Sequence, residues 1–356
     1  MSPAPDPIHD QSAAPVIRLS DPTEVVAGLP ALFGFRPRES LIFLAVERPR
    51  GRLGFRARVD LPVGAEVADA ATLLVGAALA NHVDTVIVLC HSEHLQLAES
   101  AARHLAAAFA GGGVVVADVI QCDDSRFRSL SCTSPGCCPP EGRPYDSTSS
   151  LLVAEAVGLG QRVLRDRSEL AAEVAEPDEA TARRMSRACD RVRSRLVRTY
   201  GTDPAREDAQ LQVPALRGGA TEVKAVIAGA LGTGVSRLSD DDVAVLGVWC
   251  RCITVRDVAW AQVDAGDPLE HLELWQAVAR RTIAPLEPAV LSMVAFCAWM
   301  SGDGARAWCA LDRALQADAD YSMAHLLHTV LTNAVPPSTW QPVAEARVWE
   351  AAEAPD

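Results

Sequence analysis

Two apolar runs on either side of a helical segment decide the fold, Thr85-Val-Ile-Val-Leu-Cys90 and Val114-Val-Val-Ala-Asp-Val-Ile120. Short runs of this kind, without polar alternation, are typical of strands that are buried on both faces of a sheet. The segment between them, 95–110, is rich in alanine and predicts a helix that ends at Gly111-Gly-Gly113. A strand, a helix and a strand in this order predict two parallel strands of one sheet.

Two further strands are predicted before this unit. The apolar runs 40–47 and 53–59 are joined by Pro49-Arg-Gly51, which predicts a β-hairpin. A second Ala-rich stretch, 65–81, predicts a helix that leads into the strand at Thr85. This order of elements predicts an α/β domain whose sheet is mostly parallel, with one antiparallel hairpin strand.

The rest of the chain has the apolar spacing of helices and predicts an all-α helical domain. The clearest predicted helices are 240–253, 268–282, 287–300, 304–317 and 320–333. The domain organisation that follows is a disordered tail at 1–17, the α/β domain at 18–148 ending in a Cys-rich loop, the helical domain at 149–335, and a Pro- and Glu-rich tail at 336–356.

Composition excludes several functional classes. The chain of 356 residues has a net charge of −13 and a pI of about 5.1, which argues against general binding to nucleic acid or to anionic membranes. The N-terminus lacks the pattern of a signal peptide, and no apolar run reaches the roughly 18 residues of a membrane span. We therefore expect a cytoplasmic protein whose ten cysteines are thiols or metal ligands.

One loop concentrates the candidate chemistry, Cys132-Thr-Ser-Pro-Gly-Cys-Cys-Pro-Pro-Glu-Gly-Arg-Pro-Tyr145. A structural zinc ion needs four nitrogen or sulfur ligands, although the spacing here lacks the usual C-x2-C pairs. The candidate zinc ligands are Cys122, Cys132 and one of Cys137 and Cys138, with His91 or His94 as the fourth. Two alternatives stay open: a reactive thiol activated by Arg128 or Arg143, and a rigid loop whose cysteines pack as small apolar residues.

The predicted sheet edge supplies a second candidate site. The strands at 53–59, 85–90 and 114–120 end at one edge, followed by Asp60, His91 and Cys122. Asp60 and His91 could form an acid/base pair there. The alternative is that Asp60 hydrogen-bonds its own turn and that His91 begins a helix.

Arginines form two further groups. Arg36 and Arg38 could bind an anion or could stabilise a turn, and no glycine-rich nucleotide motif accompanies them. A stripe spaced by three and four residues on one predicted helix consists of Arg184, Arg187, Arg191, Arg195 and Arg198. The stripe could contact a partner protein, nucleic acid, or an acidic face of this same chain.

Four separated stretches together resemble one known family. They are Leu29-Pro-Ala-Leu-Phe-Gly-Phe-Arg-Pro-Arg-Glu-Ser-Leu41, Arg56-Ala-Arg-Val-Asp-Leu-Pro62, Cys137-Cys-Pro-Pro-Glu-Gly142 and Trp299-Met-Ser-Gly-Asp-Gly304. In these the chain resembles the actinobacterial family catalogued as domain of unknown function 4192, over roughly residues 18–335. The resemblance implies a cytoplasmic bacterial protein and brings no known activity, cofactor or catalytic residue.

Two hypotheses for function follow from these observations. The first is an interaction or regulatory protein that docks through its helical half, suggested by the arginine stripe and by the lack of a known catalytic motif. The second is a metal- or thiol-dependent enzyme with a cleft at the sheet edge, beside the loop from Cys132 to Arg143.

Overall fold

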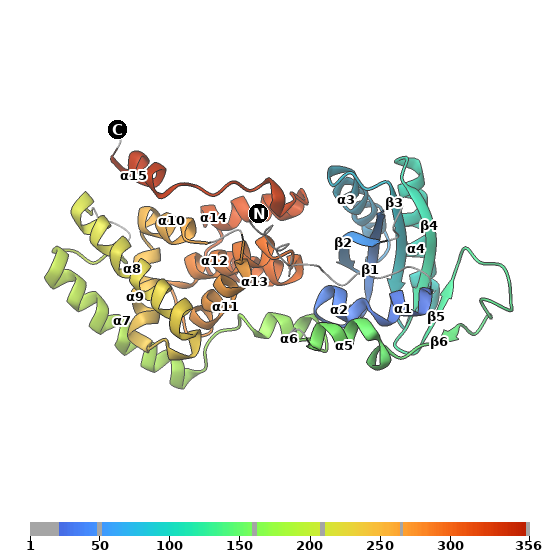
Figure 1. Cartoon of the computed structure of the whole chain (residues 1–356), viewed down its shortest axis with the longest axis horizontal. Helices are drawn as coiled ribbons and strands as arrows, with labels where there is room; N and C mark the ends of the chain where they lie inside the picture. Colours follow the sequence, from blue (N-terminus) through green and yellow to red (C-terminus); the bar gives the residue numbers. More distant parts are fainter. Residues whose placement is uncertain (1–20, 48–51, 159–161, 207–210, 264–265, 354–356) are drawn as a thin grey trace, which may run out of the picture. The chain divides into compact units, whose positions relative to one another are not determined.

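A computed structural model describes residues 21–47, 52–158, 162–206, 211–263 and 266–353 (Figure 1). The predicted N-terminal tail and the hairpin turn at 49–51 lie outside these ranges. Contacts within the chain divide it into two compact units, 1–167 and 168–356.

The division at residue 167 lies beyond the boundary predicted at 148/149. Helix α5 (Leu151–Gly158) packs against α1 (Pro22–Ala27) and α2 (Leu29–Phe33). At Gly28 a Cβ atom would lie only 2.4 Å from the Cδ1 atom of Leu152. Close packing of this kind makes the segment after residue 148 part of the first unit.

The first unit contains one six-stranded sheet with the strand order β2-β1-β3-β4-β5-β6. Its strands are β1 (Ser40–Glu47), β2 (Arg52–Asp60), β3 (Thr85–His91), β4 (Val115–Cys122), β5 (Arg126–Ser129) and β6 (Arg143–Pro144). The parallel pair predicted from residues 85–120 is confirmed as β3 and β4. The hairpin of β1 and β2 is confirmed as well.

The prediction of a mostly parallel sheet is wrong. Strand β1 lies between β2 and β3 and is antiparallel to both, and the pairs β4–β5 and β5–β6 are also antiparallel. Strands β2 and β3 do run in the same direction, as a crossover helix requires, but they are not neighbours. The order of elements along the chain fixes the direction of each strand and leaves its neighbours undetermined.

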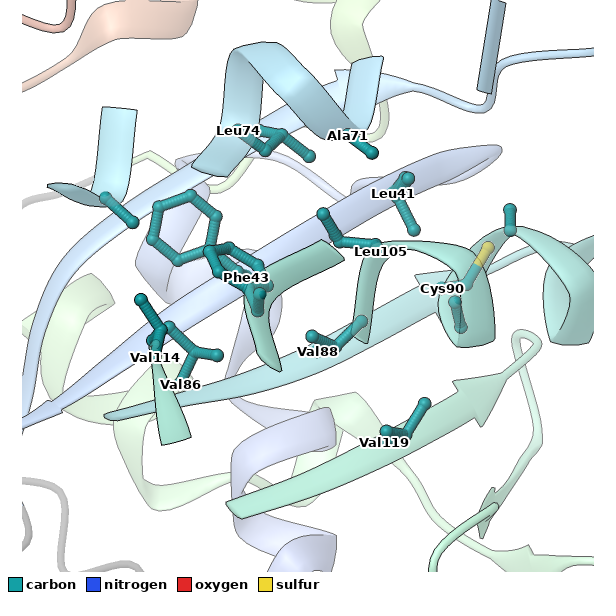
Figure 2. Close-up of a cluster of buried hydrophobic side chains, with 14 of the residues drawn as sticks. Leu41, Phe43, Ala71, Leu74, Val86, Val88, Cys90, Leu105, Val114 and Val119 are labelled. Carbon is teal, nitrogen blue, oxygen red and sulfur yellow. The ribbon is translucent and has the colours of Figure 1, made fainter. Parts of the chain in front are cut away.

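Both faces of the central strands are covered. On one face, α3 (Glu66–Ala80) and α4 (Leu95–Gly111) pack on an apolar cluster that includes Phe43, Val88 and Leu105 (Figure 2). On the other face, residues from α1 and α2 join the alternate strand residues, including Ile42 and Leu89, in a second cluster. Strand β3 is consequently buried along its whole length, as the apolar run predicts.

The second unit is helical in the part of it that the structure describes. Its helices after α6 (Arg167–Ala172) are α7 (Glu179–Tyr200), α8 (Val213–Thr233), α9 (Asp240–Cys250), α10 (Ile253–Ala261), α11 (Pro268–Ala279), α12 (Glu287–Met300), α13 (Gly304–Ala317), α14 (Ser322–Thr332) and α15 (Glu345–Glu353). Helix α12 is buried on all sides from Glu287 to Trp299, so it forms the centre of this unit. Helix α15 belongs to the segment predicted as a tail and packs on α10.

A pair of glycines brings α8 close to two aromatic rings. A Cβ atom at Gly219 would lie 2.6 Å from ring carbons of Trp249, a side chain of α9 that is fully buried. The neighbouring Gly218 faces the ring of Tyr200, which packs edge-on against Trp249. These helices can approach only because both positions lack a side chain.

We predict that Gly219→Ala lowers the free energy of unfolding of the helical unit by about 1–3 kcal/mol, because the added methyl group overpacks the contact with Trp249. The measurement is a urea titration followed by tryptophan fluorescence, since all seven tryptophans lie between Trp249 and Trp349.

The matched control is Gly229→Ala in the same helix, where no atom lies within 4 Å of the added carbon. This variant should be neutral, or more stable by up to about 1 kcal/mol, because alanine favours helix. Equal shifts in the two variants would refute the packing role of Gly219.

Candidate functional site

The cysteine-rich loop joins β5 to β6 and is folded by its own backbone. The N–H groups of Cys137 and Cys138 both donate hydrogen bonds to the carbonyl oxygen of Ser134, at 3.1 and 2.8 Å. At its start, the N–H of Cys132 donates to Ser129 Oγ at 3.1 Å, and this hydroxyl donates in turn to Asp118. The tight turn and the anchored start bring the two ends of the cysteine motif together.

As a result, the sulfur atoms of Cys132, Cys137 and Cys138 all lie within 4.8 Å of one another. A zinc ion bound at about 2.3 Å from each sulfur places tetrahedral sulfurs about 3.8 Å apart. Rotation of one or two side chains by about 1 Å would therefore close three thiolates on one ion. Cys137 is exposed and the other two are half-buried, so the site is open to solvent.

The three thiols differ in acidity. The pKa of Cys132 is lowered, chiefly by a hydrogen bond from the backbone N–H of Ser134. Burial instead raises the pKa of Cys138 to about 11. Of these two thiols, Cys132 therefore loses its proton more readily, and it is the better ligand for an incoming metal ion.

The structure does not bring Cys122 or His91 to these three cysteines. The N–H of Leu130 bonds to the carbonyl oxygen of Val119, so the loop begins three residues back along β4 from Cys122. At about 3.3 Å per residue this separation is roughly 10 Å. Strand β5 runs antiparallel to β4 and returns the chain toward Asp118, away from the edge where His91 lies.

The two arginines considered as activators of a thiol are engaged elsewhere. Arg128 donates to Gln121 and to Glu99, and the guanidinium of Arg143 stacks over the ring of Phe127. Cys122 itself is buried, and burial raises the pKa of its thiol. It acts as a core residue in the cluster beneath α1.

At the predicted sheet edge, the first residue of β1 and the last residues of β2, β3 and β4 are paired with their neighbours. Ser40, the first residue of β1, pairs with Asp60 on one side and with His91 on the other, and His91 pairs with Cys122. Because β1 separates them, Asp60 and His91 are two strand spacings apart, about 10 Å. Asp60 binds Arg58 and lies 3.6 Å from Arg167, so its partners are arginines and not His91.

His91 has a different carboxylate partner, which the sequence did not indicate. Its Nε2 atom lies 3.4 Å from Oδ1 of Asp124, and Arg38 binds the same carboxylate with Nε at 3.1 Å and Nη2 at 2.5 Å. His91 is only 5 % exposed, and burial is the main cause that lowers its pKa. The imidazole is therefore neutral near pH 7 and is held by Asp124.

Glu39 and Arg36 complete this edge. Glu39 has a left-handed backbone with φ of 42°, and its carboxylate accepts hydrogen bonds from Ser92 Oγ and from the N–H of Glu93. Arg36 lines a small pocket together with His91 and Asp124. Arg38 thus stabilises Asp124. The backbone N–H of Arg36 donates to the carbonyl oxygen of Leu164 at 3.2 Å, whereas its guanidinium makes no hydrogen bond or ion pair to another residue in the described ranges.

The arginine stripe of α7 is largely paired within its own unit. Arg195 binds Glu222 of α8 through two hydrogen bonds, at 3.1 and 2.6 Å, and Arg191 binds Asp241 of α9. Arg184 lies 3.5 Å from Asp240. Among described residues, the remaining two members, Arg187 and Arg198, have no ion pair. Three of the five arginines therefore have an acidic partner within their own unit.

Helices that could cross a membrane are absent from the ranges that the structure describes. A search of curated proteins and a search of solved structures find no match to this chain. The family model described as "Domain of unknown function (DUF4192)" matches residues 22–338, which includes β1 to β6, the cysteine loop and α7 to α14. The resemblance seen in four separated motifs is thereby confirmed, and the chain belongs to this DUF4192 family.

Proposed function

We propose that this protein binds a thiophilic metal ion through Cys132, Cys137 and Cys138, as a cytoplasmic metal-binding regulatory protein. The observation that carries the proposal is the mutual approach of the three sulfur atoms within 4.8 Å. Three thiolates in one place are a soft ligand set, which favours Zn²⁺ and Cu⁺ over Mg²⁺ or Ca²⁺.

The loop is prepared for binding before an ion arrives. The turn at Ser134 fixes Cys137 and Cys138 relative to Cys132, and Pro139 and Pro140 restrict the chain that follows. The chain of hydrogen bonds from Cys132 to Ser129 and Asp118 supports the first ligand from behind. Groups of this kind orient the ligands of known metal sites and affect their affinity.

Exposure of the site favours exchange of the ion over a purely structural role. Structural zinc is usually enclosed by four protein ligands, whereas three cysteines and no histidine form this group among the described residues. The fourth position of a zinc ion would take water, and a Cu⁺ ion would need no fourth ligand. An ion held in this way can be gained and lost as its concentration changes.

The alternative of docking through the helical half has weaker support. This alternative was suggested by the arginine stripe of α7. Three arginines of the stripe already pair with Asp240, Asp241 and Glu222. A partner protein would have to compete with these contacts.

We predict about one equivalent of zinc or copper per chain after reconstitution of the reduced protein, and at least about tenfold weaker binding in Cys132→Ser, because one of three thiolate ligands is lost. The measurement is metal content by mass spectrometry, together with the sulfur-to-metal charge-transfer absorption of the cobalt form.

Cys252→Ser is the matched control, since Cys252 is a half-buried cysteine of the helical unit that lies outside the loop. It should bind metal as the unchanged protein does. Failure of the reduced protein to take up any thiophilic ion, or an equal loss in Cys252→Ser, would end the proposal.

We also predict that affinity rises with pH. The pKa of Cys138 is raised to about 11, so near pH 7 the thiol must release its proton when the ion binds. Because this one proton is released, the affinity for the metal ion should increase about tenfold for each pH unit, as long as the pH lies below the pKa of Cys138. Competition titrations between about pH 6.5 and pH 8.5 measure this slope, and Cys138→Ser should reduce it by about one proton. An equal slope in both proteins would contradict the assignment of Cys138 as a ligand.

A further inference from the structure

The last helix of the chain, α15, lies on a surface formed by α8 and α10. Figure 1 shows the extended segment that leads to it. This segment, residues 341–344, is exposed at each position. The family match ends at residue 338, so α15 lies outside the matched part of the chain. We call the surface that α15 covers, which includes Arg217 and Lys224 of α8, the α15 seat.

One face of α15 contacts the seat. The residues of this face, which are buried or half-buried, are Glu345, Val348, Trp349 and Ala352. The other five residues of the helix are exposed. The buried positions follow the spacing i, i+3, i+4 and i+7, by which an amphipathic helix of one protein lies in a groove of another. Helix α15 therefore contacts the helical unit in the way that a separate helical ligand would.

Basic groups of the seat match acidic groups of α15. The Nζ atom of Lys224 donates to both carboxylate oxygens of Glu345, at 2.9 and 3.0 Å. Arg217 pairs with Glu353 at 2.5 Å. The two basic residues are seven positions apart on α8 and the two carboxylates eight positions apart on α15, which is about 10 and 12 Å along each helix. The seat thus fits a helix that carries two carboxylates about two turns apart.

The side chain of Trp349 is the apolar anchor between these carboxylates. It is only 9 % exposed, and the guanidinium carbon of Arg217 lies 4.5 Å from the centre of its ring. Its Nε1 atom donates to Glu345 at 3.1 Å. A cation over an aromatic face is attractive, and large aromatic side chains are often the strongest contacts of an interface. A ligand of this seat therefore needs a large aromatic residue as well as acidic groups.

The attachment of α15 consists of side-chain contacts. Within the described ranges, no backbone hydrogen bond joins residues 341–353 to the rest of the chain. The two ion pairs are partly exposed, and exposed pairs contribute little to stability. A helix this short is not stable alone in water. By contrast, the ring of Trp340 stacks on Trp260 with centroids 5.1 Å apart. Release of α15 would break side-chain contacts only and would leave Trp340 in place.

We propose that the α15 seat is a docking surface for an acidic amphipathic helix of a partner protein, and that α15 occupies the seat as an internal competitor. The partner helix carries a large aromatic residue and two carboxylates two turns apart, as α15 does. Because α15 belongs to the same chain, its effective concentration at the seat is high, and only a helix with well-matched contacts displaces it. The seat is separate from the arginine stripe of α7 and from the metal site.

The experiment measures binding of a fluorescein-labelled peptide with the sequence of residues 343–353 to the full-length protein, by fluorescence anisotropy. The test variant combines Val348→Ser with Trp349→Ser, which removes both buried anchors of α15 and opens the seat. We expect this opened variant to bind the peptide at least about tenfold more tightly than the unchanged protein, because the internal competitor is weakened.

The matched control combines Arg347→Ser with Glu350→Ser, two changes on the exposed face of the same helix. It leaves the seat covered and should bind the peptide within about twofold of the unchanged protein. Thermal unfolding shows whether each variant is folded. Cys132→Ser should bind the peptide as the unchanged protein does.

Charge reversal tests the assigned contact directly. Adding Lys224→Glu to the opened variant should weaken peptide binding at least about tenfold, because Glu345 of the peptide then faces a like charge. A peptide with Glu345→Lys should restore part of the affinity in this protein and should bind less well to the opened variant that keeps Lys224.

Hydrogen exchange gives a second measurement that needs no variant. The unchanged protein is labelled with nitrogen-15 and mixed with excess unlabelled peptide, so that only its own α15 is observed. The amides of α15 should exchange faster as the peptide displaces this helix.

Four outcomes would overturn the proposal. Three are the absence of saturable peptide binding to the opened variant, equal affinity in the opened and control variants, and unchanged exchange of α15 when peptide is in excess. The fourth is a dimer of the unchanged protein that dissociates in the opened variant, because the seat would then hold α15 of a second copy. Rescue of Lys224→Glu by the Glu345→Lys peptide would support the proposal.

Discussion

Strand β3 is the constraint on which the first unit depends. All of its residues are buried, and it is hydrogen-bonded to β1 on one side and to β4 on the other. A slip of one residue would move every side chain to the opposite face of the sheet, where the packing of Phe43 and Val88 on α4 would be lost. The position of His91 opposite Ser40 and Cys122 is therefore set by the hydrophobic core, and the polar edge is built on it.

Elements with a long periodic pattern could be predicted from the sequence. The parallel pair β3–β4 and the helices of the second unit are of this kind, because each buries a continuous apolar run or stripe. The neighbours of β1 could not be predicted, since strand order depends on contacts between distant segments. Strands β5 and β6, with four and two residues, are too short to give a pattern. Because β5 reverses the chain, the cysteine loop lies toward Asp118 and not beside His91.

Single residues of the candidate sites could be predicted from the sequence, but their partners could not, because these come from distant segments of the chain. His91 and Arg36 stood out in the sequence, one at a strand end and the other in a basic turn, but nothing there indicated that they share a pocket. Asp124 gave only the signal of an acidic pair after a strand, and its role depends on the fold. In α7 the spacing predicted a stripe of arginines on one helix face. Two of their partners, Asp240 and Asp241, could be recognised in the sequence only as the acidic start of α9.

The hairpin of β4 and β5 has a consequence for how this family can change over evolution. Asp124 lies in its turn, and the cysteine loop leaves from its other end, with three register pairs of the hairpin between them. Residues could be inserted into the loop between Cys132 and Arg143 without moving the turn, because these pairs hold both strands. Relatives could thus lengthen, shorten or lose the loop while the histidine pocket persists. Selection can act on one end of the hairpin and leave the other end unaltered.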